Sequence, residues 1–346
     1  MLVSERIGQF FVESDGGRDR LEYTEYGSGE EWVVLLHGLL MPRRMQQPLA
    51  RAMAAQGLHV VTLDLLGHGR SDQPADPLVY SMTSFGEQVV ALLDHLGAEQ
   101  AVIGGTSLGA NVSLEVAVIA PERVKGLVVE MPVLNNALVA GILAFVPIML
   151  AARYLPVTAN VLQRVSRSIP RGLVPFWAGV GLDTVDHRAE SIAAVLHGVI
   201  FGRLAPSSSQ RRRIQAPVFL VGHPIDPIHP FVDADMLAAE LPHVRFERAS
   251  SILEWPAPCG RAGAPRRACR RRRTGGSGRP GGRRRRWGPG SAGASSTTAR
   301  AGRRSRRAAA RRSSRPGGPA CRARSRPRTA PGRAGSTARS AARCWP

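Results

Sequence analysis

The segment that most constrains the fold is residues 101–109, AVIGGTSLG. Its first residues are apolar and indicate a short strand, and residues 110–117 indicate a helix with an apolar face. The Gly-Thr-Ser-Leu-Gly between them has the G-x-S-x-G spacing of a sharp strand-to-helix turn that exposes a serine hydroxyl above a sheet. An ordinary strand–helix turn is the alternative. The flanking strand and helix favour the sharp turn, with Ser107 as a candidate nucleophile.

Charge divides the chain into two unequal parts. Residues 256–346 contain 27 Arg and no Asp, Glu or Lys, which leaves 20 basic and 26 acidic residues in the first 255, a net charge of −6. The overall net charge of +21 therefore comes from the C-terminal segment alone. A mildly acidic body of this length is large enough for one sizeable hydrophobic core.

The C-terminal segment 256–346 uses only eight residue types, all of which have codons with C or G in the middle position. Lys125 is the only lysine of the chain, as expected for a GC-rich gene. A frameshift in such a gene would produce this alphabet, so we interpret the segment as an out-of-frame translation. The alternative is a basic tail that binds nucleic acid by neutralising phosphates. Without Leu, Ile, Val or Phe the segment is expected to be disordered.

Apolar runs alternate with amphipathic runs along the body, which predicts an α/β fold with a mostly parallel sheet covered on both faces. Residues 135–209 break this alternation with apolar, helix-like sequence, and an insertion of that length predicts a separate cap. The expected divisions are residues 1–134 and 210–255 for the core, 135–209 for the cap and 256–346 for the disordered tail. Besides the strand before Ser107, strands are expected at 7–14, 21–26, 31–36, 59–64, 125–131, 216–222 and 243–249, and helices at 43–56, 82–96 and 231–241.

Cysteine usage and hydropathy bear on the compartment. The body has no cysteine and no apolar leader near its charged N-terminus, so we expect a cytoplasmic protein without a signal peptide. The longest uncharged apolar run, residues 137–152, contains Pro147 and falls short of the roughly 20 residues of a spanning helix. We interpret the apolar residues of this run as core packing within the cap. The alternative is that they form an apolar acyl pocket or make weak contact with a membrane. The four cysteines all lie in the tail: Cys259, Cys269, Cys321 and Cys344.

Four motifs occur in one order over about residues 20–250, and together they resemble the α/β-hydrolase fold family, in its serine-nucleophile, AB hydrolase-1 branch with a helical cap after the sixth strand. The motifs are Leu35-Leu36-His37-Gly38, Asp64 with Gly67-His68-Gly69-Arg70-Ser71, Gly105-Thr106-Ser107-Leu108-Gly109, and Pro217-Val218-Phe219-Leu220-Val221-Gly222 with Asp226-Pro227.

The resemblance implies a role for each candidate residue. Ser107 would attack an acyl carbonyl, and the backbone N–H groups of Leu108 and of Leu39 or Leu40 would form the oxyanion hole. Asp226 would be the acid that orients a histidine, with a turn-capping aspartate as the alternative. A second possible acid position, which could equally hold the cap, is Glu130.

The resemblance fails where the catalytic histidine is expected, after the last strand at residues 249–251. A serine without a general base is a poor nucleophile near neutral pH. His223 and His229 flank Asp226 and could supply the base from the neighbouring loop. Two more distant candidates lie in the cap, His187 and His197, and two further histidines are expected to brace loops, His37 and His68.

The resemblance implies hydrolysis of an ester or similar acyl compound through an acyl-enzyme, without metal or organic cofactor. A serine at position 107 disfavours the carboxylate-nucleophile branches, the epoxide hydrolases and haloalkane dehalogenases. The expected partner is a small, apolar ester, with no obligatory nucleic acid, and the oligomeric state stays open. A catalytically silent scaffold and a nucleic-acid binder are the alternatives.

Overall fold

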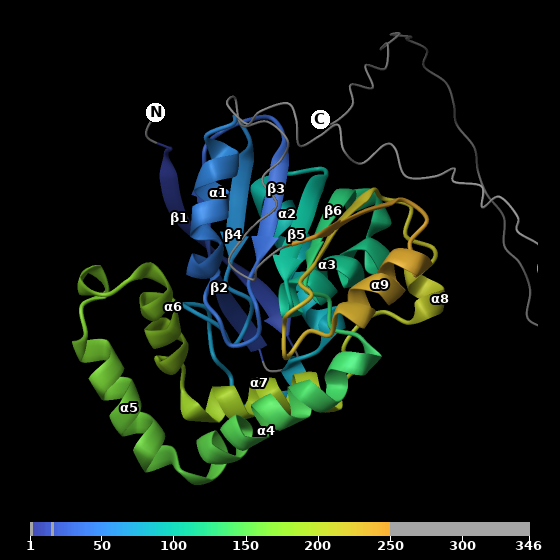
Figure 1. Cartoon of the computed structure of the whole chain (residues 1–346). Coiled ribbons are helices and arrows are strands. Elements are labelled where there is room, and N and C mark those ends of the chain that lie inside the picture. The colour runs from blue at the N-terminus through green and yellow to red at the C-terminus, as the bar shows by residue number, and fades with distance from the viewer. Residues whose placement is uncertain (1–2, 15–16, 250–346) are drawn as a thin grey trace, which may run out of the picture. The chain divides into compact units, whose positions relative to one another are not determined.

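The computed structural model describes residues 3–14 and 17–249, so every expectation for the tail lies outside the described residues. Eight strands form one sheet in the order β1-β2-β4-β3-β5-β6-β7-β8 (Figure 1). β2 is antiparallel to both β1 and β4, and the other pairings are parallel, which confirms the predicted mostly parallel sheet. The strands are β1 (Glu5–Ser14), β2 (Gly17–Tyr26), β3 (Trp32–Leu36), β4 (His59–Leu63), β5 (Ala101–Thr106), β6 (Val124–Glu130), β7 (Val218–Gly222) and β8 (Val244–Arg248).

Helices cover both faces of the sheet because the central strands are apolar at successive positions. On one face, α1 (Gln47–Ala54) packs on Val33, Leu35 and Val60. The intervening side chains of the same strands belong to the larger core on the opposite face, under α2 (Met82–Leu96), α3 (Leu108–Ile119) and α9 (Phe231–Glu240). This second core holds the helix that follows Ser107.

The predicted helix at residues 43–56 is divided in two. A 3₁₀ turn, η1 (Arg43–Gln46), comes first, and the α-helix α1 begins only at Gln47. Pro48 lies in the first turn of α1, the one place in a helix where its missing N–H costs no hydrogen bond. The proline therefore sets the start of α1.

Four longer helices lie between β6 and β7 and pass the carboxyl-end edge of the sheet (Figure 1). α4 packs along α7, and α5 contacts α6. These elements are η4 (Asn135–Ala137), α4 (Leu138–Tyr154), α5 (Pro156–Ser168), η5 (Arg171–Leu173), α6 (Phe176–Val185), α7 (Ala189–Phe201) and α8 (Ser208–Arg211). The remaining 3₁₀ turns of the described chain are η2 (Pro77–Val79) and η3 (Pro121–Arg123).

Two buried polar side chains tie this helical insertion to the core. Asn111 of α3 donates from Nδ2 to the carbonyls of Val133 (2.7 Å) and Leu204 (2.6 Å), one before and one after the inserted helices. Asp233 of α9 accepts hydrogen bonds from the backbone N–H groups of Leu134 (2.8 Å) and Ala137 (3.0 Å). Both ends of the insertion are therefore fixed above the carboxyl ends of β5 and β6.

Candidate active site

The turn at Ser107 has the sharp geometry that the G-x-S-x-G spacing predicts. Ser107 has φ 58° and ψ −111°, a strained conformation for a residue with a side chain. Its N–H donates to the carbonyl of Glu130 (2.9 Å), which holds the turn against the end of β6. A Cβ on Gly105 would lie 2.6 Å from the carbonyl carbon of Gly109, so the crossing of strand and helix requires glycine.

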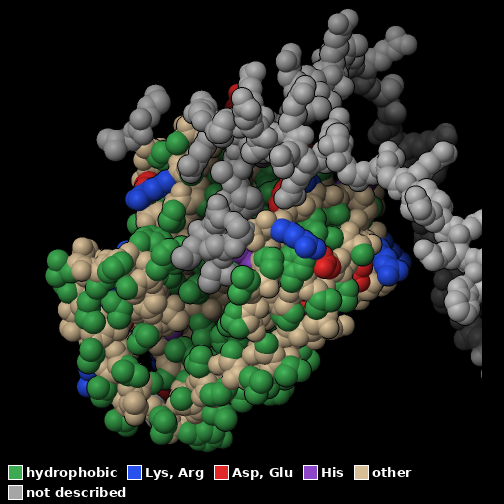
Figure 2. All heavy atoms as spheres, viewed as in Figure 1, with side chains coloured by type: hydrophobic (Ala, Val, Ile, Leu, Met, Phe, Trp, Pro, Cys, Tyr) green, Lys and Arg blue, Asp and Glu red, His purple; other side chains and the backbone are tan. Residues whose placement is uncertain are grey.

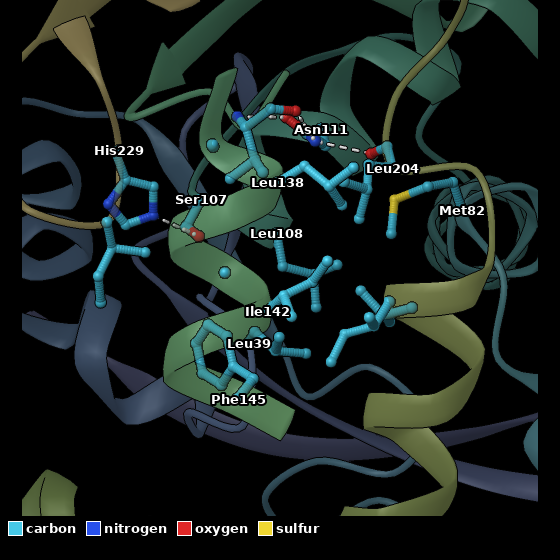
Figure 3. A pocket seen from close by; sticks show the side chains of 16 residues that line it. Leu39, Met82, Ser107, Leu108, Asn111, Leu138, Ile142, Phe145, Leu204 and His229 are labelled. Atoms are coloured by element: carbon cyan, nitrogen blue, oxygen red, sulfur yellow. Dashed lines mark hydrogen bonds between the residues drawn. The ribbon is translucent and has the colours of Figure 1, made fainter. Parts of the chain in front are cut away.

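His229 lies against Ser107. Its Nε2 is 2.8 Å from the hydroxyl oxygen of Ser107 (Figure 3), and its Nδ1 is 2.9 Å from Oδ2 of Asp226. Oδ1 of the same aspartate accepts from the backbone N–H groups of Ile228 (2.7 Å) and His229 (2.9 Å). Asp226 thus caps its own turn, and the turn brings His229 back over the carboxylate. The same carboxylate therefore holds the turn with Oδ1 and contacts the His229 ring with Oδ2.

The charge state of Asp226 fixes the orientation of the imidazole. Burial raises the pKa of Asp226, but hydrogen bonds from the ring and backbone of His229 outweigh burial and hold that pKa at about 2. The ionised carboxylate can only accept, so Nδ1–H of His229 donates to it. Nε2 is left to accept a proton from the Ser107 hydroxyl, the arrangement that a general base needs.

The free energy of unfolding at low pH should depend on the ionisation of Asp226. A carboxyl with a pKa of 3.8 when unfolded and about 2 when folded stabilises the fold above pH 4. That contribution is lost as the pH falls from 4 through 2. We expect Asp226→Asn to remove about 1–2 kcal/mol of this pH dependence, because the side chain is only 8% exposed and is little screened by solvent. Urea unfolding of both proteins between pH 2 and 5 measures it, and parallel curves would contradict the assignment.

His223, the other candidate base, lies elsewhere. It is buried, with Nε2 3.0 Å from Oε1 of Glu130. The other oxygen of Glu130 accepts from the hydroxyl of Thr106 (2.6 Å), and Gln46 donates to the same hydroxyl (3.2 Å). Glu130 and His223 therefore belong to a buried network behind Ser107. Neither Thr106 nor Gln46 stands out in the sequence as a site residue.

The remaining histidines do not contact Ser107. His37 is fully buried, and burial lowers its pKa, so the neutral ring accepts from the N–H of Leu65 (3.1 Å) and its Nδ1 bonds the carbonyl of Gly38 (2.9 Å). This arrangement braces the loop after β3. Burial also lowers the pKa of His187, whose Nε2 accepts from the N–H of Gly69 (2.7 Å). Two others are His68, whose pKa burial holds well below its usual range, and His197, on α7.

Two backbone segments near Ser107 contain the residues predicted to form an oxyanion hole. Leu108 is the first residue of α3, where the N–H has no partner within the helix. Leu39 lines the same pocket as Ser107, whereas Leu40 is buried in a left-handed conformation with φ 61° and does not line it. Of the two candidates in this loop, Leu39 is therefore the residue that lines the pocket together with Ser107.

The pocket over Ser107 is lined almost entirely by apolar side chains (Figure 3). Asn111 also reaches it, but its amide bonds backbone groups on both sides of the pocket. Ser107 and His229 are thus the polar side chains left to act on a bound molecule. The apolar lining includes Met82 and residues of α4 and α7, among them Leu138, Ile142, Phe145, Val199 and Ile200.

Within the described ranges, no group of three or more His, Cys, Asp or Glu side chains is arranged to hold a metal ion.

Comparisons with known proteins agree with this architecture. Residues 31–167 match the family model of the α/β-hydrolase fold. The chain is 40% identical over 75 residues to 2-hydroxymuconate semialdehyde hydrolase of Pseudomonas putida (22% of this chain, 26% of the relative). It is 36% identical over 96 residues to epoxide hydrolase B of Mycobacterium tuberculosis (28% and 27%). These matches thus span only about a quarter of the relatives' length.

Solved structures share the fold over a longer stretch. A hydrolase from Pseudomonas aeruginosa superposes with a TM-score of 0.56 at 22% identity, covering 70% of this chain and 90% of that one. The enol-lactonase of Burkholderia xenovorans gives 0.55 at 20% identity, covering 69% and 91%. With the strand order and the turn at Ser107, these findings show that the chain has the α/β-hydrolase fold, as the sequence motifs predicted.

Proposed function

We propose that the protein is a serine hydrolase that cleaves a carboxylic ester or similar acyl compound through an acyl-enzyme on Ser107. The observation that carries the proposal is the continuous path of hydrogen bonds from the Ser107 hydroxyl to His229 and on to Asp226, at 2.8 and 2.9 Å. Nucleophile, base and orienting acid in that order are the general arrangement for serine acyl transfer.

The chemistry follows from this order of groups. Nε2 of His229 takes the hydroxyl proton as the oxygen of Ser107 bonds to the acyl carbon, and Asp226 stabilises the imidazolium. The N–H groups of Leu108 and Leu39 would hold the negative oxygen of the tetrahedral intermediate. Collapse breaks the bond to the leaving alcohol, which receives the proton from His229. Water then attacks the acyl-enzyme by the same steps and releases the acid.

The relatives do not fix the reaction, because their names include a semialdehyde hydrolase, epoxide hydrolases and an acetyltransferase component. The residue at position 107 separates these chemistries. A serine hydroxyl fits acyl transfer, whereas the epoxide hydrolase branch uses a carboxylate nucleophile. The apolar pocket walls favour a substrate with an apolar acyl or alcohol group.

A catalytically silent scaffold was the alternative because no histidine follows the last strand, and the position of His229 supports the active enzyme instead. Nucleic-acid binding by the tail concerns residues outside the described part of the chain and stays a prediction. The cytoplasmic location also stays a prediction.

A fluorophosphonate probe tests the proposal, because it reacts covalently with activated serines and spares ordinary ones. We expect the intact mass to rise by one adduct in the native protein and to stay unchanged in Ser107→Ala. The matched control is Ser113→Ala, which removes the hydroxyl of a buried serine on the same helix that bonds the carbonyl of Gly109 (2.7 Å). No adduct on the folded native protein would favour the silent scaffold.

A further inference from the structure

The helices over the pocket expose an unusual amount of apolar surface. Helix α4 is apolar on all sides, a pattern typical of helices that are fully buried or in contact with lipid. Yet Val139 is 67% and Leu143 is 72% exposed. With its preceding turn, the segment Asn135–Tyr154 is long and apolar enough to cross a membrane by length and composition, and it is longer than the apolar run at residues 137–152. Figure 2 shows hydrophobic side chains gathered over this part of the molecule.

Helix α5 is amphipathic, but its apolar face points outward. Ser166 is buried and donates to the carbonyl of Leu182 (2.9 Å), so the polar face packs on α6. Val157, Val161 and Val165 are spaced by four residues, share one helix face and are 75%, 49% and 54% exposed. Soluble proteins bury such a stripe. The inverted orientation indicates that an apolar partner covers it.

The charge on this surface identifies the partner. Between Glu130 and Asp183 the chain contains four Arg and no Asp, Glu or Lys, although the body as a whole is acidic. Arg171 pairs with Asp183 and Asp186, and the other three, Arg153, Arg164 and Arg167, lie on α4 and α5. Arg164 follows Val157 and Val161 by seven and three residues and therefore lies on the exposed side of α5. A second copy of the chain would bring two such basic surfaces together. Anionic lipid headgroups would instead attract them while the valine and leucine side chains enter the acyl region.

The remaining contacts of α4 decide how it would meet a bilayer. Phe145 and Ile142 on its inner side line the pocket over Ser107, and Ala152 is buried against α7. Crossing the membrane would dismantle this pocket, so α4 must lie along the surface. Ile142 is also 39% exposed, so the pocket wall continues into the outer apolar surface.

We infer that the outer face of α4 and α5, which we call the apolar cap face, docks the protein on the surface of an anionic lipid bilayer. The docking itself does not depend on the reaction. Docking in this orientation would let a lipophilic ester pass from the bilayer to Ser107. That consequence rests on the proposed function.

Vesicle binding by the full chain tests the docking. Because the tail carries many Arg, the decisive probe is neutral phosphatidylcholine vesicles in about 0.5 M salt, where charge attraction is screened. We expect the native protein to sediment with these vesicles, and Leu143→Glu combined with Val161→Glu to weaken binding at least tenfold. Ile7→Glu, at an exposed apolar position on β1, is the matched control and should leave binding unchanged.

The arginines are tested on vesicles that also contain phosphatidylglycerol. Replacing Arg153 and Arg164 with Gln should weaken binding by about fivefold for each residue. The same change at Arg212 and Arg213, exposed and outside the cap face, should have a smaller effect.

Three results would overturn the inference. The first is that the native protein does not bind vesicles. The second is that the Leu143→Glu/Val161→Glu variant binds vesicles as tightly as the native protein. The third is that the native protein binds no vesicles but forms a dimer in sedimentation equilibrium, which the variant does not form. The last would assign the face to a second copy. Turnover of a soluble short-chain ester should be unaffected in the variant, because neither residue lines the pocket. Vesicle binding should be unaffected in Ser107→Ala, so failure of the docking and failure of the hydrolase are distinguishable.

Discussion

Replacing His229 with glutamine should lower kcat/KM for a soluble short-chain ester by at least about a thousandfold, the loss expected when a serine nucleophile loses its base. Glutamine fills a similar volume and can still donate to Asp226, but it cannot take the proton of Ser107. The effect should lie in kcat, because in the proposed mechanism the imidazole acts on the reacting atoms and forms little of the apolar wall of the pocket. Steady-state kinetics on the purified variant measures it, with fluorophosphonate labelling as a second readout.

His223→Gln is the matched control. It flanks the same aspartate in the sequence, and glutamine can still donate to Glu130 from a similar position. We expect turnover within about tenfold of the native value, provided that the midpoint of urea unfolding is unchanged. An inactive, stable His223→Gln beside an active His229→Gln would show that the base had been assigned to the wrong histidine.

The fold could be predicted well from the sequence because its strands are buried on both faces. Residues 33–36 are all nearly inaccessible in the structure, and such continuous apolar runs admit few alternatives. The glycines around Ser107 were equally informative, since their spacing reflects a backbone crossing that any Cβ would obstruct. The predicted element boundaries differ from those of the structure mainly where a single residue sets the start of a helix, as Pro48 does for α1.

The base could not be chosen from the sequence. His223 and His229 are both three residues from Asp226, one on each side. Hydrophobic periodicity does not indicate where the side chains of a loop point. The choice depends on the turn, in which Asp226 accepts the backbone N–H groups of Ile228 and His229 and so directs the second histidine toward Ser107. His223 is instead drawn to Glu130, a contact between residues 93 positions apart.

The orientation of α5 was also beyond sequence reasoning. An amphipathic pattern shows that a helix has two faces, and the usual assumption is that the apolar one points inward. Here the polar face is held by tertiary partners. Gln163 donates to the carbonyl of Asp186 (2.7 Å) and Ser166 to that of Leu182, both in or next to α6. Only the placement of α6 reveals which face is left outside.

Gly109→Ala should destabilise the fold by about 3 kcal/mol or more, a large share of the 5–15 kcal/mol typical of a domain. A Cβ at this position would lie 2.5 Å from the carbonyl oxygen of Leu36 and 2.7 Å from its carbonyl carbon. Those atoms are backbone of the central strand β3, so the clash can be relieved only by moving α3 away from the sheet. That movement would also break the hydrogen bond from the N–H of Gly109 to the carbonyl of His37 (3.1 Å), at the start of the loop after β3.

Gly181→Ala in α6 is the matched control, because a Cβ there meets nothing within 4 Å. Alanine in an open helical position should stabilise by about 0.5–1 kcal/mol, since glycine loses more backbone entropy on folding. Urea unfolding of the two variants and the native protein checks both signs. Equal stabilities for Gly109→Ala and the native protein would mean that α3 lies farther from β3 than the structure places it. The position of Ser107 relative to His229 would then be wrong as well.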